Sequence, residues 1–180
     1  MYGSNTLITK NRLATTLGVL PKQFDVTFDF YATKWISGWT NLFHLTTGPN
    51  CCAQGSRIPA VFSLNGKLLF VFAVNGNGTY NLYTPKLTLN RWYNFRINQR
   101  LEGGNYVYRV YMGKQLLRMI VNKKPQDYKN VKVFVGDNYH NAQPGYIENL
   151  RITNTPVVYA GRVISFPSFS KQNDKRQNFW

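Results

Sequence analysis

Apolar and polar positions alternate with a period of two along much of the chain between Phe24 and Ile152. In the run FDVTFDFYAT, Phe24, Val26, Phe28 and Phe30 alternate with more polar residues, which is typical of a half-buried strand. Similar short runs follow, separated by Asn-Gly, Gly-Gly, Gly-Pro and Pro-Gly turn signals, and helical periodicity is almost absent. The pattern predicts roughly ten to twelve strands and no connecting helices.

The turn signals also predict how neighbouring strands connect. IPAVFSL and KLLFVFAV flank Asn65-Gly66, a dipeptide favoured in a hairpin turn that needs positive φ at both central residues. We expect the next reversal at the four residues 75–78, and another at Gly103-Gly104. The strands predict an all-β fold of two packed antiparallel sheets, with an up-and-down barrel as the alternative. The expected shared core comprises Phe24, Phe28, Phe95, Ile97, Val133 and Leu150.

Composition divides the chain into three parts. Residues 1–20 read as an N-terminal extension with edge strands, and residues 21–155 as the sandwich domain. Residues 156–180 are basic and aromatic, and Pro156 and Pro167 disfavour a continuous helix there. We expect an extended C-terminal arm that docks on its own sandwich or on a neighbouring subunit, using the anchors Tyr159, Phe166, Phe169, Phe179 and Trp180.

Charge narrows the class of partner. Twenty-two Lys and Arg face seven Asp and Glu, a net charge of +15, which favours an anionic surface or glycan. No zinc-finger, helix-turn-helix or RNP pattern accompanies the charge, so we expect no sequence-specific nucleic-acid binding. The longest apolar run, Leu68–Val74, is too short for a transmembrane helix, which needs about 20 residues. No signal-peptide pattern is visible at the N-terminus.

The two cysteines are adjacent, at Cys51 and Cys52. They cannot join distant strands, because the sequence has no other cysteine. Two states stay open from the sequence: a pair of free thiols in a loop, or a vicinal disulfide.

The order of the strands and turn motifs resembles the concanavalin A-like lectin/glucanase superfamily, in its laminin-G-like branch. The resemblance lies in FDVTFDFYATKWISGWTNLFHLTTG, GSRIPAVFSLNGKLLFVFAVNG, LTLNRWYNFRINQ, YRVYMGKQLLRMIVN and VKVFVGDNYHNAQPGYIENLRI, and covers about 70% of the chain. It implies a concanavalin A-like jelly roll. Similar single modules occur in marine invertebrate and large DNA virus proteins, and the superfamily includes lectins, adhesion modules, glycosidases and capsid decorations.

Catalytic residues of the superfamily's glycosidases are not matched. These enzymes place paired carboxylates a few residues apart on one strand. Asp25 and Asp29 share a face, but they lie opposite the phenylalanine row on an early strand. His44 and His140 have no nucleophile or metal-ligand spacing around them, so we interpret both as structural or surface residues. We therefore expect no enzymatic activity.

Two binding sites are nevertheless implied. Members of the superfamily hold calcium through loop oxygens, which makes Asp137 the candidate calcium ligand here, although a structural role for its loop is the alternative. Binding a sugar needs an exposed aromatic face and planar amides. The candidates are Trp35, Trp39, Asn41, Asn75, Asn77, Asn138, Tyr139 and His140. The alternative is that Trp39 and Trp92 belong to the core and the asparagines only form turns.

The sequence thus favours a non-enzymatic structural subunit of a larger assembly, of the virion, minor capsid or extracellular matrix type. The expected partners are other protein subunits, and the expected location is a virion or the extracellular space. The alternative is a glycan-binding lectin module.

Overall fold

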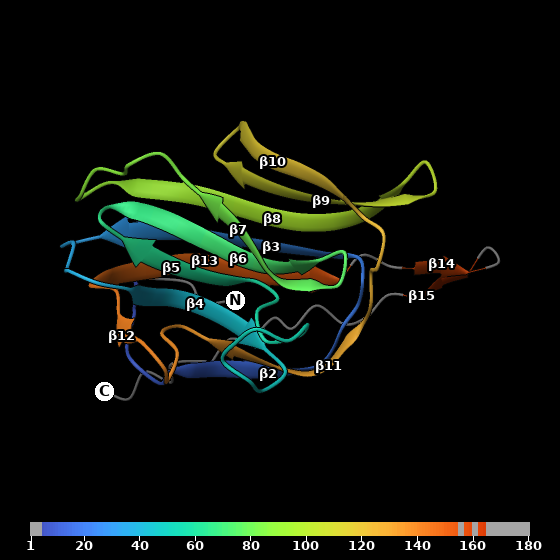
Figure 1. Ribbon diagram of the computed structural model, residues 1–180, viewed down its shortest axis with the longest axis horizontal. Helices are drawn as coiled ribbons and strands as arrows, with labels where there is room; N and C mark the ends of the chain where they lie inside the picture. Colours follow the sequence, from blue (N-terminus) through green and yellow to red (C-terminus); the bar gives the residue numbers. More distant parts are fainter. Residues whose placement is uncertain (1–4, 155–156, 160–161, 165–180) are drawn as a thin grey trace, which may run out of the picture.

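Two antiparallel sheets pack against each other in the computed structural model (Figure 1), which describes residues 5–154, 157–159 and 162–164. The six-stranded sheet has the order β1 (Thr6–Leu7), β13 (Gly145–Asn154), β3 (Phe24–Ala32), β8 (Trp92–Glu102), β9 (Asn105–Met112) and β10 (Gln115–Asn122). The second sheet has the order β2 (Leu13–Leu20), β11 (Tyr128–Phe134), β4 (Thr40–Thr46), β5 (Ala60–Leu64), β6 (Lys67–Val74) and β7 (Asn77–Tyr83). Its seventh strand, β12 (Asn141–Ala142), pairs in parallel with β4.

Residues of the N-terminal segment supply an edge strand to each sheet, because β1 pairs with β13 and β2 pairs with β11. Within the expected arm, β14 (Val157–Tyr159) and β15 (Arg162–Ile164) form a separate two-stranded hairpin. The other arm anchors, Phe166, Phe169, Phe179 and Trp180, lie outside the described residues, and so does the expected docking of the arm.

The strand content agrees with the sequence pattern. Eleven strands, β3 to β13, lie within the continuously described stretch from Phe24 to Asn154, and none of the described residues is helical. Accordingly, no helix long and apolar enough to cross a membrane occurs in the part of the chain that the structure describes.

The core lies between the sheets and is rich in phenylalanine. Phe28 of β3 and Phe95 of β8 stack with ring centroids 5.4 Å apart, and both are fully buried. They meet the opposite sheet through Phe43 of β4, 5.7 Å from Phe28, and Phe70 of β6, 5.4 Å from Phe95. All six residues predicted for the core are buried, so the period-two pattern identified the inward face correctly.

The predicted Asn-Gly hairpins form, with one difference in length. Asn65 and Gly66 have φ of 51° and 79°, and Asn75 and Gly76 have φ of 58° and 79°, as a tight turn with two left-handed residues requires. The second reversal uses only Asn75 and Gly76, because Asn77 and Gly78 already belong to β7. Gly78 has a packing role instead. A Cβ atom there would lie 2.5 Å from the backbone oxygens of Cys52 and Ala53.

Candidate functional site

The outer face of the seven-stranded sheet is apolar at its centre. Strands β5 and β6 are hydrophobic on both faces: Val61, Leu68 and Phe70 join the main core, whereas Ala60, Phe62, Leu69 and Val71 form a second, separate cluster. Successive side chains of a strand point to opposite faces, so the second cluster lies on the side of the sheet away from the main core. A sheet face of this composition is expected to be covered, and side chains of the chain itself leave these four residues at most 6% exposed.

A pocket of about 420 Å³ opens over this second cluster. The strands contribute Phe62 from β5, Leu69 and Val71 from β6, and Thr79, Asn81 and Tyr83 from β7; the loops contribute Trp39, Cys51, Cys52, Arg57 and His140. Pockets of this volume, with apolar and aromatic walls and a few polar groups, are typical of small-molecule sites.

Aromatic and cationic side chains gather around Phe62. Its ring makes edge-on contacts with His140 at 4.9 Å and with Trp39 at 6.4 Å between centroids. The guanidinium carbon of Arg57 lies 4.9 Å from the Phe62 ring centroid, within the range of a cation–π interaction. Trp39 and Tyr83 are 44% and 49% exposed, so both offer ring surface to a ligand.

The long loop between β4 and β5 forms one side of the pocket. Within this loop, Nε of Arg57 donates a hydrogen bond of 3.0 Å to the carbonyl oxygen of Asn50. Cys51 and Cys52 are joined by a disulfide, one of the two states left open by the sequence. The close packing of this loop on Gly78 links it to β7. The hydroxyl of Tyr139 donates a hydrogen bond of 3.0 Å to the carbonyl oxygen of Gly48. This bond links the loop between β4 and β5 to the loop that follows β11.

Buried Asp137 holds the loop after β11 in place. Its carboxylate accepts hydrogen bonds from the backbone N–H groups of Tyr139 and His140 at 3.1 and 2.8 Å, and lies 3.0 Å from Nδ1 of both His44 and His140. Burial alone would raise the pKa of Asp137. The hydrogen bonds from His140 and His44, together with the charge of His140, instead lower this pKa well below its usual value.

This arrangement alters the interpretation of Asp137 as a calcium ligand. The side chain is inaccessible to solvent, and its two oxygens are occupied by donors from the protein. A group of three or more His, Cys, Asp or Glu able to hold a metal ion does not occur among the described residues. In the structure, Asp137 has the alternative role, that of fixing its loop.

His44 is positioned by an irregularity in β4. The register between β4 and β5 shifts between Asn41 and Phe43, as at a β-bulge, and both Leu42 and Phe43 are fully buried in the main core. Nε2 of His44 lies 2.7 Å from the carbonyl oxygen of Ser56 and Nδ1 faces Asp137. Both neighbours of the ring are hydrogen-bond acceptors. His44 therefore connects β4 with both pocket loops.

Of the aromatic residues predicted for a glycan site, Trp39 and His140 line the pocket. Tyr139 is adjacent to it and 44% exposed. Trp35 is not among the residues that line the pocket; its side chain is partly buried and packs against the main core, 6.4 Å from Phe30. The alternative placement of Trp39 and Trp92 in the core is wrong, since they are 44% and 40% exposed.

The predicted asparagines have structural contacts. Asn41 is fully buried, and its Oδ1 accepts a hydrogen bond from the backbone of Asp137 at 2.9 Å, so its assignment as a ligand contact is wrong. Asn75 accepts from the backbone of Lys123 and Asn77 from that of Thr79, as residues that fix turns do. Asn138 is exposed but is not among the residues that line the pocket.

Sequence reasoning missed the centre of the site, namely Arg57, Phe62, Leu69, Val71, Thr79, Asn81 and Tyr83. A signal was present in KLLFVFAV, which is apolar at both odd and even positions. A strand of this kind is normally buried on both faces, and the sandwich buries only one face of it against the other sheet.

The carboxylates considered for catalysis are on the other sheet. Asp25 of β3 accepts hydrogen bonds from Arg96 and Arg100, and Asp29 from Asn94 and Asn149. Neither aspartate lines the pocket. The outer face of the six-stranded sheet thus carries hydrogen-bonded aspartates, of which Asp25 is paired with two arginines, in contrast to the apolar outer face of β5 and β6.

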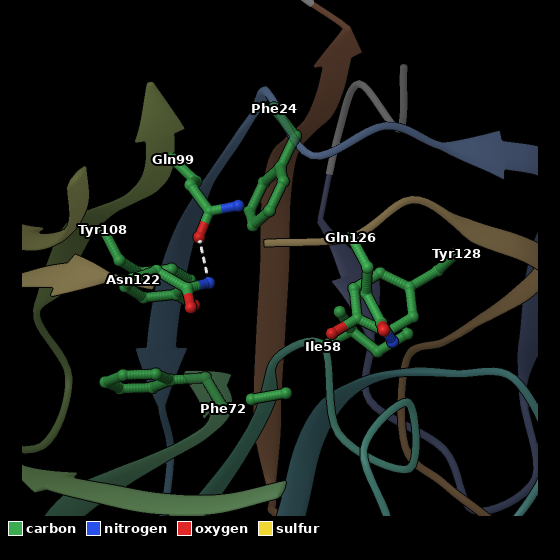
Figure 2. Close-up of a pocket in the computed structure, with 9 residues that line it drawn as sticks. Phe24, Ile58, Phe72, Gln99, Tyr108, Asn122, Gln126 and Tyr128 are labelled. Atoms are coloured by element: carbon green, nitrogen blue, oxygen red, sulfur yellow. Dashed lines mark hydrogen bonds between the residues drawn. The ribbon is translucent and has the colours of Figure 1, made fainter. Parts of the chain in front are cut away.

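A second cavity lies within the sandwich (Figure 2). Its volume is about 10 Å³, enough for about one water molecule. Asn122 donates a hydrogen bond of 2.7 Å to Gln99 at its edge, and the hydroxyl of Tyr108 has no partner among the described residues. Burial raises the pKa of Tyr108, which keeps this hydroxyl neutral. The cavity is therefore a packing feature of the core.

Comparisons with known proteins identify the fold. No protein-family model matches the sequence, and no match was found among curated proteins. Among solved structures, a SAP-like pentraxin from Limulus polyphemus superimposes with a TM-score of 0.53 and 16% identity, over 84% of this chain and 73% of the pentraxin chain. Domain 4 of the arabinanase AbnA from Geobacillus stearothermophilus, in complex with arabinotriose, gives a TM-score of 0.52 and 13% identity, over 84% of this chain and 82% of that domain.

Domains LG4-5 of the mouse laminin α1 chain give a TM-score of 0.51 and 13% identity, over 92% of this chain and 45% of the laminin chain. Identities this low establish the fold only. The chain is an all-β, two-sheet sandwich of the concanavalin A-like jelly-roll type, as the sequence motifs predicted, and its structural neighbours are lectin-like, laminin-G-like and carbohydrate-binding domains.

Proposed function

We propose that this protein is a glycan-binding module that works without catalysis, and that the pocket on the outer face of β5, β6 and β7 holds the sugar. The observation that carries the proposal is the solvent-accessible pocket of about 420 Å³ over a second apolar cluster. Between the two functions considered from the sequence, this pocket favours the lectin module.

The chemistry of the pocket suits a sugar. A pyranose ring has an apolar face formed by C–H groups and an edge of hydroxyls, so it is bound by an aromatic ring beside hydrogen-bonding side chains. Trp39 and Tyr83 offer partly exposed rings, and Thr79 and Asn81 follow each other at alternate positions of β7 on the same face. Nδ1 of His140 faces Asp137, and Nε2 has no hydrogen-bond partner among the described residues.

Structural neighbours give further support. Domain 4 of AbnA was solved with arabinotriose, which shows that a jelly roll of this type can bind an oligosaccharide. None of the carboxylates that a glycosidase would need lines the pocket among the described residues. This composition supports binding without hydrolysis.

A glycan array with the purified full chain tests the proposal, followed by calorimetry on the strongest hits. We expect selective, saturable binding to a small group of oligosaccharides with one site per chain. Signal on every glycan alike, or no saturable binding to any of them, would contradict the proposal.

A structural subunit of a virion or extracellular matrix is the second candidate. It is favoured by β10, the last strand in the order of the six-stranded sheet, which exposes Leu116, Met119 and Val121. Exposed apolar side chains along an edge strand are suited to contact another subunit. The net charge of +15 further suits an acidic partner subunit or an anionic surface.

Deletion of residues 156–180 tests this second function. A structural subunit whose arm docks into a neighbour should lose incorporation into its particle or matrix, while the truncated sandwich keeps its β-rich circular dichroism. Normal incorporation of the folded, truncated chain would count against the arm as an assembly element.

A further inference from the structure

Arg57 places a positive charge in the pocket without a protein carboxylate beside it. The side chain is half-buried, and its guanidinium lies over the Phe62 ring at 4.9 Å. Only Nε has a hydrogen-bond partner among the described residues, the carbonyl oxygen of Asn50. The two terminal nitrogens therefore keep their donors for a ligand.

Asp137 interacts electrostatically with Arg57 but does not neutralise its charge. The oxygens of Asp137 are held by His44, His140 and two backbone N–H groups. Burial lowers the pKa of Arg57, and the attraction of Asp137 offsets this effect only in part. No Asp or Glu occurs among the described residues that line the pocket. A partly desolvated cation is thus left with an aromatic ring and one carbonyl as its neighbours.

Other arginines of the chain are paired with carboxylates. Arg96 donates to Asp25, and Arg109 donates with both terminal nitrogens to Glu102 at 2.6 Å. A guanidinium binds a planar or tetrahedral oxyanion through such paired hydrogen bonds, which are stronger than those between neutral groups. Arg57 has no such carboxylate partner among the described residues, and it lines the open pocket instead.

We propose that the pocket selects a glycan with an acidic substituent, a carboxylate or a sulfate ester, which pairs with Arg57 while the sugar ring lies against the exposed aromatic side chains. This inference rests on the proposed glycan-binding function and names its ligand class. Phosphorylated small molecules share the oxyanion but lack the sugar ring, and they serve as a separate arm of the test.

The test uses small, singly charged probes, because a basic protein binds polyanions without selectivity. Isothermal titration calorimetry compares lactose carrying one 3′-sulfate with lactose, and the monosaccharide galacturonic acid with its methyl ester. Inorganic phosphate and sulfate are titrated alone. The variants are Arg57→Gln and, to keep the charge but remove the planar fork, Arg57→Lys.

Arg91→Gln is the matched control, since Arg91 is also a cation above an aromatic ring, 5.6 Å from the Tyr93 centroid, but it is exposed and outside the pocket. Thermal unfolding of each variant verifies that it is folded. A misfolded Arg57→Gln protein leaves Arg57→Lys as the decisive variant.

We expect at least one acidic probe to bind about 10- to 100-fold more tightly than its neutral counterpart, a range typical of hydrogen bonds to a charged group. Arg57→Gln should abolish this preference, Arg57→Lys should reduce it, and Arg91→Gln should leave it unchanged. Equal binding of acidic and neutral sugars would overturn the acidic ligand but leave the lectin function standing. Failure of these probes and of every glycan on the array to bind would overturn both, and binding of free phosphate or sulfate as tight as that of the sugars would show an anion site only.

Discussion

Nδ1 of His44 lies 3.0 Å from Oδ2 of Asp137, and neither side chain is accessible to solvent. This contact joins a central strand of the seven-stranded sheet to the loop that carries His140 into the pocket. The other ring nitrogen of His44 holds the carbonyl oxygen of Ser56, next to Arg57. One buried pair thus positions two sides of the candidate site.

Removing one partner of this pair should be costly. Asp137→Asn replaces the buried carboxylate that faces the His44 ring with a neutral amide, and leaving a buried polar group without its hydrogen-bond partner typically lowers the free energy of unfolding by about 1–3 kcal/mol. Urea denaturation measures the effect. Asp127→Asn is the control, since Asp127 is exposed and only accepts a hydrogen bond from the backbone of Lys22; an equal loss in both variants would argue against a special role of the buried pair.

The carboxylate of Asp137 should also make the stability of the protein depend on pH in the acid range. The pKa of Asp137 is lower in the folded protein than in the unfolded chain, so its contribution is fully present above the unfolded pKa of about 3.9. It is lost as the pH falls from that value toward the folded pKa, because the unfolded state then binds the additional proton. Midpoints of urea unfolding between pH 7 and pH 2 should fall more steeply for the wild type than for Asp137→Asn. Parallel curves would contradict this account.

The packing of the hydrophobic core can be tested at Phe28. Its ring is fully buried and contacts Phe95 and Phe43 from both sheets, so Phe28→Ala should lower the free energy of unfolding by about 3–5 kcal/mol. Leu101→Ala, at a side chain that is 48% exposed, should change it by no more than about 0.5 kcal/mol. A loss below about 1 kcal/mol for Phe28→Ala would be inconsistent with a close-packed ring at this position.

Gly78 offers a test of the pocket wall. In Gly78→Ala the new Cβ would meet the backbone oxygens of Cys52 and Ala53 at 2.5 Å, so the loop that lines the pocket has to move. We expect a loss of roughly 1–3 kcal/mol in stability, as for other overpacked sites, together with weaker sugar binding. Gly18→Ala, also within a strand but with no atom within 4 Å of its Cβ, should preserve binding. Unchanged affinity in Gly78→Ala would place the binding site away from this loop.

The strands, the hairpin turns and the core could be predicted from the sequence, because they depend on local apolar–polar alternation and on the preference of Asn-Gly for tight turns. The sequence also contained the apolar outer positions Leu69 and Val71, which were read only as strand residues. It did not predict the roles of Trp35 and Arg57. Their orientation depends on how loops pack against the sandwich, and no periodic pattern encodes that packing.

The buried cluster around Asp137 was beyond sequence reasoning for a related reason. A register shift in β4 brings Asn41 and His44 to the same loop, whereas strict alternation would place residues three positions apart on opposite faces. Irregularities of this kind depend on the pairing of strands distant in the sequence. The sequence therefore left two roles open for Asp137, a calcium ligand or a residue whose hydrogen bonds fix its loop.

Titration of Trp39→Ala with the oligosaccharide that binds the wild type most tightly tests the central claim most directly. The matched control is Trp92→Ala, because Trp92 is 40% exposed, close to the 44% of Trp39, but belongs to the other sheet. We predict that Trp39→Ala weakens binding at least about tenfold, consistent with the loss of one aromatic contact of about 1.5 kcal/mol, while Trp92→Ala binds like the wild type. Wild-type affinity in Trp39→Ala, or equal losses in both variants, would contradict a glycan site on the outer face of the seven-stranded sheet.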